Sequence, residues 1–493
     1  MLKRLIVFLL VFSFAAIAIA QTDTPRKPVI IDTDMAADDW MAILYLLQRS
    51  DVDVRAITVT GTGEAHCDPG VQNTMNLLAL AGTPDIPVAC GRETPLQGNH
   101  VFPAEWRENV DAMAGIELPT NTNAPGTISA IELLSEQINA SSENITLLTL
   151  GPLTNIAEAL QAEPALIDKI DRIYIMGGAV SVPGNLYTDN ATAEWNIYVD
   201  PLAASIVFES GLPITLVALD VTNQAPITID FYSRLARDRT TPEAEFVYQA
   251  LTANLEGISG GWLYFWDPLA AVALTEPGIV SIQGRPLRVV TDEGVESGRT
   301  MPDGDGVPID VAVGVDTAAF ERIFLNVLNG RDPQAPLPAQ VTVAEGGEAN
   351  AAVVQRYFEE VWGTQNFAVL DELLDPNYLS HNNSDPFVGN RDSLMSTIAV
   401  LHTMMPDLQL TVQEMIVVGD TAAARITLRG THTGDFLSLP PTNNPIVITI
   451  NSILHLADGR IVEEWQAVDF FGLLIGTGAI PPDVLEALFA GEE

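Results

Sequence analysis

The stretch VIIDTDMAADDWMAILYLL, from Val29 to Leu47, joins a short apolar run to a segment with helical spacing. A continuous apolar run such as VIID is typical of a strand buried on both faces of a parallel sheet, and DDWMAILYLLQ is typical of a helix. The loop between them carries four aspartates, namely Asp32, Asp34, Asp38 and Asp39. In α/β sheets, ligands bind outside the carboxyl ends of the strands, so this loop is a candidate site.

The same alternation of strand and helix continues from residue 28 to about residue 330. VRAITVT, NITLLTL and DRIYIMG are further strand-like runs, and TISAIELLSEQINA and PLTNIAEALQA are helix-like segments. Alternating β and α segments indicate crossover connections and parallel strands. The sequence therefore predicts an α/β domain with a doubly wound, mostly parallel sheet over residues 28–330.

This pattern ends in residues 331–346, which are rich in proline and then in glycine and glutamate, and we interpret them as a linker. Residues 347–493 begin with the amphipathic segment NAAVVQRYFEEVWGT and continue with alternating runs such as TAAARITLRGTHTG and PIVITINSILHLA. The pair Asp458-Gly459 separates two such runs and is a hairpin signal. Helices followed by antiparallel strands predict a second, α+β domain.

Residues 1–20 have the three parts of a secretory signal peptide. MLKR is basic, LIVFLLVFSFAAIAIA is an apolar run of 16 residues, and Ala18-Ile19-Ala20 is a small-x-small cleavage site. The run is shorter than the roughly 20 residues of a spanning helix, and an uncleaved anchor is the alternative. The sequence predicts an exported protein, periplasmic or extracellular, with no stable membrane anchor after cleavage.

The chain is strongly acidic, with 64 acidic and 23 basic residues and a net charge of −41. Loss of Lys3 and Arg4 with the signal peptide leaves 21 basic residues and a charge of −43. This charge argues against nucleic acid and anionic membranes as partners. The two cysteines, Cys67 and Cys90, are too few for a four-thiolate zinc site; they either form a disulfide in an oxidising compartment or remain buried thiols.

The four aspartates repel one another, and helix capping explains only part of their clustering. Asp38 and Asp39 fall in the first turn of the predicted helix, where the helix dipole stabilises an anion by about 0.3–1 kcal/mol. Asp32 and Asp34 have no such explanation. A hard cation would explain all four, because Ca²⁺ takes six to eight oxygen ligands whereas zinc prefers histidine and cysteine. The spacing favours Ca²⁺, with capping and solvation as the alternative.

Five motifs in order resemble the nucleoside hydrolases, the inosine-uridine-preferring family. They are DTDMAADDWMAI (32–43), TLGPLTNIA (149–157), IMGGAVSVPGN with TAEWNIYVDP (175–201), LDVTNQ (219–224) and WDPLAA (266–271). The resemblance covers residues 28–330. It implies hydrolysis of the N-glycosidic bond of a nucleoside to ribose and a free base. The alternative is a module that binds a nucleoside-like ligand without hydrolysis, with any chemistry in the second domain.

The resemblance also assigns roles to residues. It implies Ca²⁺ ligands at Asp34, Asp39, Asp267 and the carbonyl of Leu150, with Asp34 as the general base for a water and Asp32 in support. The implied substrate-binding residues are Asp38, Met176, Asn185, Glu194, Trp195 and Asn196, of which Trp195 replaces the usual phenylalanine. Metal, water and carboxylates suit attack at C1′ through an oxocarbenium-like state.

Two departures from the family concern the leaving base. Trp266 stands where many members have histidine and resembles the purine-preferring branch, in which a tryptophan stacks on the base. Trp106 is a candidate for the second face of that stack, with ordinary packing as the alternative. In the loop GTGEAHCDPGVQN the usual asparagine is missing, and Thr62, Glu64 or His66 is expected in its place. Glu64 and His66 are the candidate acids for protonating the base, which the sequence leaves open.

Residues 347–485 resemble the SnoaL-like polyketide cyclases, which form a cone-shaped α+β barrel around a pocket. The resembling stretches include VVQRYFEEVWGTQNFAVLDELL and ADGRIVEEWQAVDFFGLL. The resemblance implies that Asp469 is the acid–base of such a pocket and that His381 lines it. A carboxyl group in an apolar pocket would have a raised pKa. The alternative is a non-catalytic binding or dimerisation module, and a homo-oligomer is among the expectations.

Overall fold

The computed structural model describes residues 26–382, 385–436 and 439–480, so the predicted signal peptide lies outside the described residues. The chain divides into two compact units between Ala335 and Pro336, inside the predicted linker. The later part of that linker contains β10 (Gln340–Val343), which pairs with a strand of the second unit. Within the described ranges, no helix is both long and apolar enough to cross a bilayer.

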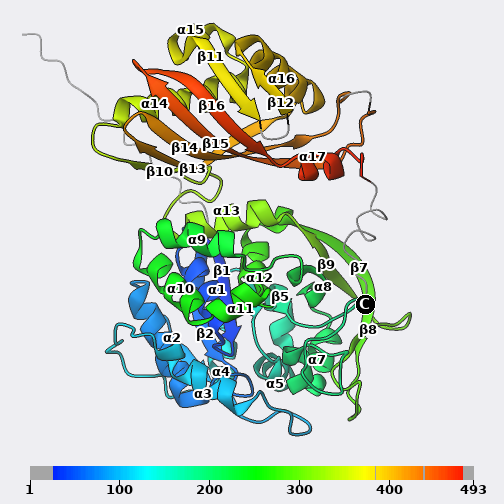
Figure 1. Cartoon of the computed structure of the whole chain (residues 1–493). Helices are drawn as coiled ribbons and strands as arrows, with labels where there is room; N and C mark the ends of the chain where they lie inside the picture. The colour runs from blue at the N-terminus through cyan, green and yellow to red at the C-terminus, as the bar shows by residue number, and fades with distance from the viewer. Residues whose placement is uncertain (1–25, 383–384, 437–438, 481–493) are drawn as a thin grey trace, which may run out of the picture. The chain divides into compact units, whose positions relative to one another are not determined.

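The first unit is built on a nine-stranded sheet with the order β3-β2-β1-β4-β5-β6-β9-β7-β8. Figure 1 shows strands β7, β8 and β9 of this sheet next to one another. All neighbouring strands from β3 to β9 are parallel, and β7 and β8 form an antiparallel edge. This confirms the predicted mostly parallel α/β sheet. The strands are β1 (Lys27–Thr33), β2 (Val52–Val59), β3 (Val88–Cys90), β4 (Ile145–Thr149), β5 (Ile170–Met176), β6 (Ile214–Val217), β7 (Val280–Val289), β8 (Thr300–Pro302) and β9 (Val307–Val315).

Thirteen α-helices are described in this unit, most of them on the connections between strands. They are α1 (Ala37–Leu47), α2 (Cys67–Leu80), α3 (Ala104–Asp111), α4 (Ala130–Ala140), α5 (Thr154–Ala162), α6 (Trp195–Val199), α7 (Pro201–Phe208), α8 (Leu219–Thr222), α9 (Ile229–Arg237), α10 (Pro242–Ala253), α11 (Leu255–Gly260), α12 (Trp266–Thr275) and α13 (Thr317–Leu328). Short 3₁₀ turns lie at Met113–Gly115, Pro164–Lys169 and Pro277–Ile279.

The buried strand β1 and the helices α1 and α12 determine where the aspartates lie. Val29, Ile30 and Ile31 are fully buried, as expected for a central parallel strand. Helix α1 packs against α12, which is buried along nearly its whole length. Neither helix has a side-chain N-cap, so no capping side chain accepts from its first-turn N–H groups. Asp39 lies in the first turn of α1, and Asp267 lies in the first turn of α12. Two chain segments distant in sequence therefore bring their carboxylates together.

The second unit is an α+β domain around one seven-stranded sheet with the order β10-β13-β14-β15-β16-β11-β12. Its other strands are β11 (Leu374–Asn382), β12 (Asp385–Gly389), β13 (Gln409–Val418), β14 (Thr421–Thr431), β15 (Pro445–Ala457) and β16 (Arg460–Val468), and β13 to β16 form an antiparallel meander. Its helices are α14 (Glu348–Arg356), a π-helical turn (Tyr357–Trp362), a 3₁₀ turn (Phe367–Val369), α15 (Leu370–Leu373), α16 (Arg391–Met404) and α17 (Phe470–Gly476). This arrangement is consistent with the predicted SnoaL-like fold.

A disulfide joins Cys67 and Cys90, so of the two alternatives for the cysteines the structure has the pair. It links the first residue of α2 to the last residue of β3.

Candidate active site

The candidate site lies where three neighbouring strands end. Asp34 follows β1, Leu150 follows β4, and Met176 is the last residue of β5. These strands are adjacent and parallel, so their carboxyl ends meet at one edge of the sheet. The site is therefore built at the edge that the sequence pattern predicts.

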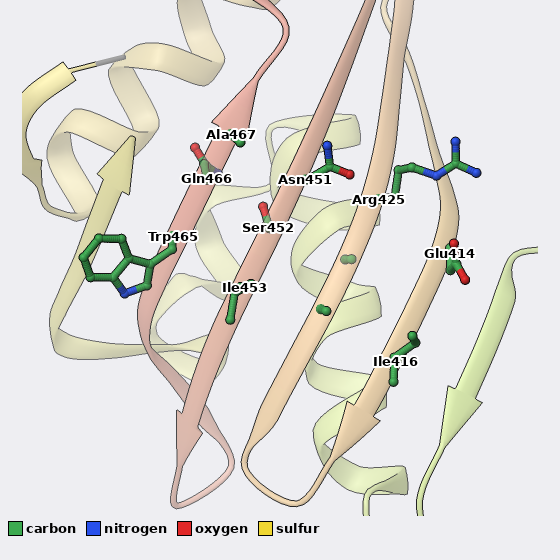
Figure 2. A pocket seen from close by; sticks show the side chains of 11 residues that line it. Glu414, Ile416, Arg425, Asn451, Ser452, Ile453, Trp465, Gln466 and Ala467 are labelled. Atoms are coloured by element: carbon green, nitrogen blue, oxygen red, sulfur yellow. The ribbon is translucent and has the colours of Figure 1, made fainter. Parts of the chain in front are cut away.

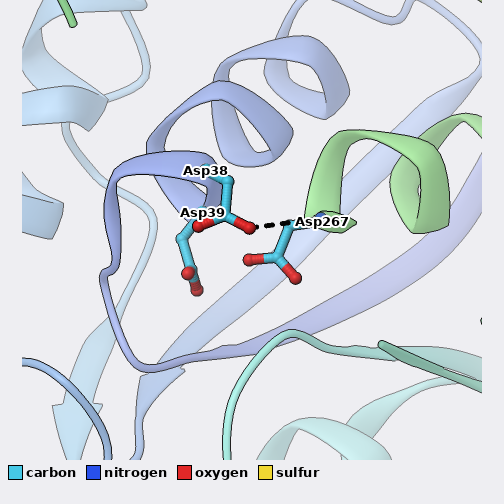
Figure 3. A group of neighbouring side chains, drawn as sticks. All are labelled: Asp38, Asp39 and Asp267. Carbon is cyan, nitrogen blue, oxygen red and sulfur yellow. Dashed lines mark hydrogen bonds between the residues drawn. The ribbon is translucent and has the colours of Figure 1, made fainter. Parts of the chain in front are cut away.

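Three carboxylates form an oxygen group at this edge. Asp38, Asp39 and Asp267 each offer an oxygen atom, and these atoms lie within 4.8 Å of one another (Figure 3). The backbone N–H of Asp267 donates to Oδ2 of Asp38 at 3.4 Å. Oδ2 of Asp39 and Oδ1 of Asp267 are buried without a hydrogen-bond partner. Two orphaned buried carboxylate oxygens are costly, and a cation with oxygen ligands would satisfy them.

Asp34 lies beside this group of three carboxylates, and its predicted role as a metal ligand stays a prediction. Its backbone N–H donates to Oδ1 of Asp39 at 3.2 Å. Its own Oδ2 accepts from the N–H of Glu64 at 3.2 Å. Asp38, predicted to bind ribose, takes the third place in the oxygen group. The sequence motif gave the four aspartates but not the directions of their side chains.

The backbone next to Asp34 adopts a rare conformation. Met35 has a φ of 62°, a left-handed value that costs energy for a residue other than glycine. Its N–H donates to Oγ1 of Thr33, and its carbonyl accepts from Nε1 of Trp40 at 2.7 Å. Thr33 also hydrogen-bonds to Asp39. Such over-determined strain is common at functional sites, where it fixes a side chain.

Burial raises the pKa values of Asp34, Asp38, Asp39 and Asp267, and repulsion from neighbouring carboxylates adds to the shift for all of them except Asp38. Burial raises the pKa of Asp38 to about 6 and that of Asp39 to about 7. Burial, reinforced by the charges of the neighbouring aspartates, raises the pKa of Asp34 and of Asp267 well above the usual range. A divalent cation would reverse this balance by stabilising the charged forms. The oxygen-only donor set fits a hard cation and does not fit zinc.

Asp32 is buried, and its hydrogen bonds go to β2 and α5; its supporting role stays a prediction. Its Oδ1 accepts from Oγ1 of Thr58 at 2.5 Å and from Nδ2 of Asn155 at 2.8 Å. Burial raises the pKa of Asp32 to about 7, while these hydrogen bonds oppose the shift. Asn155 also donates to the carbonyl of Val59. Asp32 therefore ties β1 to β2 and α5, and sequence reasoning missed its partner Asn155.

The predicted ribose-binding residues form a connected group. Glu194 caps α6 and accepts from the N–H groups of Asn196 at 2.9 Å and Gly178 at 2.9 Å. Nδ2 of Asn196 donates to the carbonyl of Leu150 at 3.0 Å and to that of Met176 at 3.4 Å. Oδ1 of Asn185 accepts from the N–H of Trp195 at 3.2 Å. The structure thus brings together Leu150, Met176, Asn185, Glu194, Trp195 and Asn196.

The two tryptophans expected to enclose the base belong to separate aromatic groups. Trp106 contacts Trp195 with ring centroids 5.4 Å apart and Tyr187 at 6.1 Å. Trp266 contacts Tyr264 at 5.7 Å and lines a small pocket with Asp38. No ring contact joins Trp106 to Trp266 among the described residues. Trp106 therefore adjoins the ribose group, and Trp266 adjoins the metal group.

Of the three residues expected in place of the missing asparagine, Glu64 is the one beside the aspartates. Burial, followed by repulsion from Asp34 and Asp38, raises its pKa well above the usual range. His66 is exposed and pairs with Asp111 at 2.6 Å. Thr62 is buried and hydrogen-bonds to Thr154. Only the three-dimensional path of the loop distinguishes Glu64 from His66.

Among the described residues of the second unit, no apolar pocket surrounds Asp469 or His381. Asp469 is exposed and caps α17 by accepting from the N–H of Gly472 at 2.9 Å. The described part of the chain does not give this carboxyl group the expected apolar surroundings, because its side chain caps a helix terminus. His381 stacks on Trp465 with centroids 3.9 Å apart, and its Nε2 lies 2.9 Å from Glu463. Both partners belong to the exposed face of β16.

The interior of the second unit holds a buried carboxyl group that sequence reasoning missed. Glu464 is fully buried and accepts from the hydroxyls of Tyr357, Tyr378 and Ser452 at 2.6–2.8 Å. Burial raises the pKa of both tyrosines. Successive side chains of β16 point to opposite faces of the sheet, so Glu464 and Trp465 lie on different faces. This alternation in the sequence could have identified Glu464 as a buried residue. Its hydrogen bonds are satisfied by core residues, which is typical of a structural role.

A hollow of about 540 Å³ opens on the exposed side of this sheet, away from that interior (Figure 2). We call this side the outer sheet face. It includes five large apolar side chains that are each more than 40 % exposed, Leu379, Ile416, Val447, Ile453 and Trp465. Along β13 to β16 it also carries Glu414 and Glu463 together with Arg425, Arg429 and Arg460.

Comparisons with known proteins identify both units. Residues 29–322 match the inosine-uridine preferring nucleoside hydrolases, and residues 352–475 match the SnoaL-like polyketide cyclases. A pyrimidine-specific ribonucleoside hydrolase, RihA, of Escherichia coli O1:K1 is 35% identical over 316 residues, which are 61% of this chain and 98% of the relative. The RihA of Citrobacter koseri is 35% identical over 308 residues, 59% of this chain and 95% of its own.

Solved structures agree with these matches. The plant nucleoside hydrolase PpNRh1 superposes with a TM-score of 0.57 at 31% identity, over 62% of this chain and 99% of that one. A purine-preferring ribonucleoside hydrolase from Gardnerella vaginalis gives 0.54 at 29% identity, over 62% and 98%. The fold is thus that of the nucleoside hydrolases. The chain belongs to the inosine-uridine preferring nucleoside hydrolase family, and it carries a SnoaL-like domain after the hydrolase domain.

Proposed function

We propose that this chain is an exported, Ca²⁺-dependent nucleoside N-ribohydrolase that converts a ribonucleoside and water to ribose and a free base. The observation that carries the proposal is the convergence of Asp38, Asp39 and Asp267 within 4.8 Å at the carboxyl edge of the sheet. The hydrogen-bonded group around Glu194 and Asn196 reaches the same edge through the carbonyl of Leu150. A metal-binding half and a ribose-binding half are therefore neighbours.

Calcium held by these carboxylates would supply a Lewis acid that acidifies water and orients ribose hydroxyls. Asp34 would accept the proton of the attacking water, whose oxygen bonds to C1′ while the C1′–N bond breaks. The electron pair of that bond and a proton go to the base. Glu194 and Asn196 would hold the ribose, and the surrounding carboxylates would stabilise positive charge on the sugar ring. Glu64, whose backbone N–H donates to Asp34, is the candidate group for giving a proton to the base.

A purine preference is the finer part of the proposal. Trp266 borders the pocket that Asp38 lines, and an aromatic face there favours a larger ring system through stacking of about 0.5–1.5 kcal/mol. Relatives with either preference are known, since RihA is pyrimidine-specific and the Gardnerella enzyme is purine-preferring. Faster cleavage of inosine and guanosine than of uridine and cytidine is expected. Faster uridine cleavage would exclude the preference.

The decisive experiment measures release of reducing sugar from these four nucleosides, with and without a calcium chelator. We expect turnover that the chelator abolishes, that calcium restores, and that Asp34→Asn lowers by several orders of magnitude. Tight binding of calcium and nucleoside without turnover of any nucleoside would favour the non-hydrolytic binding module. Full activity in Asp34→Asn would reject the assigned base.

For the second domain we propose a non-catalytic role in association of the chain. The exposed position of Asp469 and the packed interior around Glu464 disfavour a cyclase pocket.

The proposal of export rests on residues 1–20 alone. Cell fractionation of the full chain and of a variant lacking these residues tests it. Retention of the full chain in the cytoplasm would contradict export.

A further inference from the structure

The loop from Gly61 to His66, which we call the Asp34 loop, contacts both the backbone and the carboxylate of Asp34. The N–H of Ala65 donates to the carbonyl of Asp34 at 2.9 Å, and the N–H of Glu64 donates to its Oδ2 at 3.2 Å. A Cβ on Gly63 would lie 2.0 Å from Cβ of Asp34. The position of the Asp34 side chain therefore depends on the path of this loop.

Arg107 holds the Asp34 loop from the side of α3. Its guanidinium donates to the carbonyls of Gly61 at 3.1 Å, Ala65 at 3.3 Å and Glu64 at 3.4 Å. Only 8 % of Arg107 is exposed, so these hydrogen bonds are largely shielded from water. A planar guanidinium can address several carbonyls at once, which the single ammonium of lysine does less well. Arg107 thus fixes the two ends of the loop relative to each other.

The disulfide adds a covalent tie at the end of the same loop. Cys67 directly follows the loop, and its partner Cys90 ends β3, which is paired with β2 in the sheet. Asp111 adds a further tie, because its Oδ1 accepts from the N–H of His66 at 2.9 Å. The loop is therefore held by a buried guanidinium and by a covalent link to the sheet, and the N–H groups of Glu64 and Ala65 hold Asp34 to it.

We propose that Arg107 and the Cys67–Cys90 disulfide are positioning groups that hold Asp34 beside Asp39, so that calcium affinity depends on oxidation of this disulfide. This inference rests on the proposed function, since it assumes that the acidic edge binds Ca²⁺. Reduction by a dithiol transfers two electrons and two protons, giving two cysteine thiols and the oxidised, cyclic reagent. The loop then keeps only its hydrogen bonds, and Asp34 gains freedom to leave its place.

The test is calcium titration of the full chain by isothermal calorimetry, with CaCl₂ alone as the ligand. We expect Arg107→Gln and the double variant Cys67→Ser/Cys90→Ser to weaken calcium binding by about tenfold, as typical for groups that orient metal ligands. Dithiothreitol treatment of the unchanged chain should give the same shift, and Arg107→Lys should recover part of the affinity. The control is Arg55→Gln, because Arg55 is a surface residue of β2 paired with Asp53.

Two further readouts separate positioning from general stability. At saturating calcium the variants should regain most of kcat, because the loss lies in metal loading. In chelator, the melting temperatures of the Arg107 variants should stay close to that of the chain without substitutions, whereas their calcium affinity falls. Should Arg107→Gln not fold, Arg107→Lys and the reduced unchanged chain still decide the question. Unchanged calcium affinity in the folded variants and after reduction overturns the inference. If the unchanged chain neither binds calcium nor cleaves nucleosides, the proposed function fails instead.

Discussion

At the scale of single residues, close packing around Asp34 leaves little room for change. Gly63 and Gly151 approach its side chain from two directions, and a Cβ on either would lie within 2.6 Å of Cβ of Asp34. Contacts under 3.0 Å force something to move, and here the group that moves is a carboxylate of the site. The two glycines act by their lack of a side chain.

Gly63→Ala should therefore displace Asp34 and lower both calcium affinity and kcat/KM for nucleosides by at least about tenfold, as for other changes in groups around metal ligands. Calorimetry and sugar-release assays measure the two effects. Gly304→Ala is the matched control, since a Cβ at Gly304 meets nothing within 4 Å. Equal activity of the two variants would show that the loop adapts without moving Asp34.

Trp266 gives a second prediction at this scale. Replacing it with alanine removes the aromatic face beside Asp38 and should lower kcat/KM for inosine more than for uridine. The stacking contribution of about 0.5–1.5 kcal/mol corresponds to a loss of about 2- to 13-fold. Trp106→Ala is the informative comparison, because Trp106 packs with Trp195 and Tyr187 instead. An equal loss for both nucleosides would assign Trp266 to packing.

At the scale of elements, the N-termini of α1 and α12 bring carboxylates together at a cost that depends on pH. Without metal, burial raises the folded-state pKa of Asp38 to about 6 and of Asp39 to about 7, above the unfolded value of 3.8. The folded, metal-free chain therefore binds more protons than the unfolded chain, and its stability falls as pH rises from about 4 to 7.

The stabilisation by calcium should consequently grow over the same range, because calcium binds the ionised carboxylates. We expect the rise in melting temperature on adding calcium to be larger at pH 7.5 than at pH 5. Differential scanning calorimetry in calcium and in chelator measures it, and Asp39→Asn should reduce the difference. A calcium effect that is independent of pH would place the bound ion elsewhere.

Element types and order could be predicted from sequence, but side-chain directions could not. The apolar runs and helical spacing predicted the parallel sheet and the loop of Asp34, because burial dictates those patterns. Asp38, Asp39 and Asp267 offer the grouped oxygens because of their side-chain directions, which sequence spacing does not describe. Asp469 fitted a motif, yet its side chain caps α17. Arg107 donates to backbone carbonyls, and Asn155 donates to the buried carboxylate of Asp32. Contacts of these kinds do not follow from the spacing of residues in the sequence.

At the scale of the whole molecule, the outer sheet face differs from the acidic remainder of the chain. Along β13 to β16 it carries two glutamates and three arginines, whereas the chain as a whole has a charge of −41. Two copies can approach face to face here without the repulsion expected elsewhere.

A dimer through this face is therefore expected, and Trp465→Glu should convert it to a monomer. Light scattering after gel filtration of the full chain measures the mass. Val400→Glu is the control, since Val400 is 41% exposed on α16 rather than on the sheet. A monomeric unchanged chain would contradict self-association, and a dimer that survives Trp465→Glu would place the interface elsewhere.

Strand β10 has a consequence for dividing the chain into its two parts. It pairs in parallel with β13 from Gln340 to Val343, so it occupies the hydrogen-bonding edge of that strand. A fragment that starts at residue 347, the boundary predicted from the sequence, would lack it and expose the N–H and C=O groups of β13. Open edges of this kind recruit strands from other chains and lead to aggregation. A fragment that starts at Pro336 keeps the edge covered and is the appropriate form for studying the SnoaL-like domain alone.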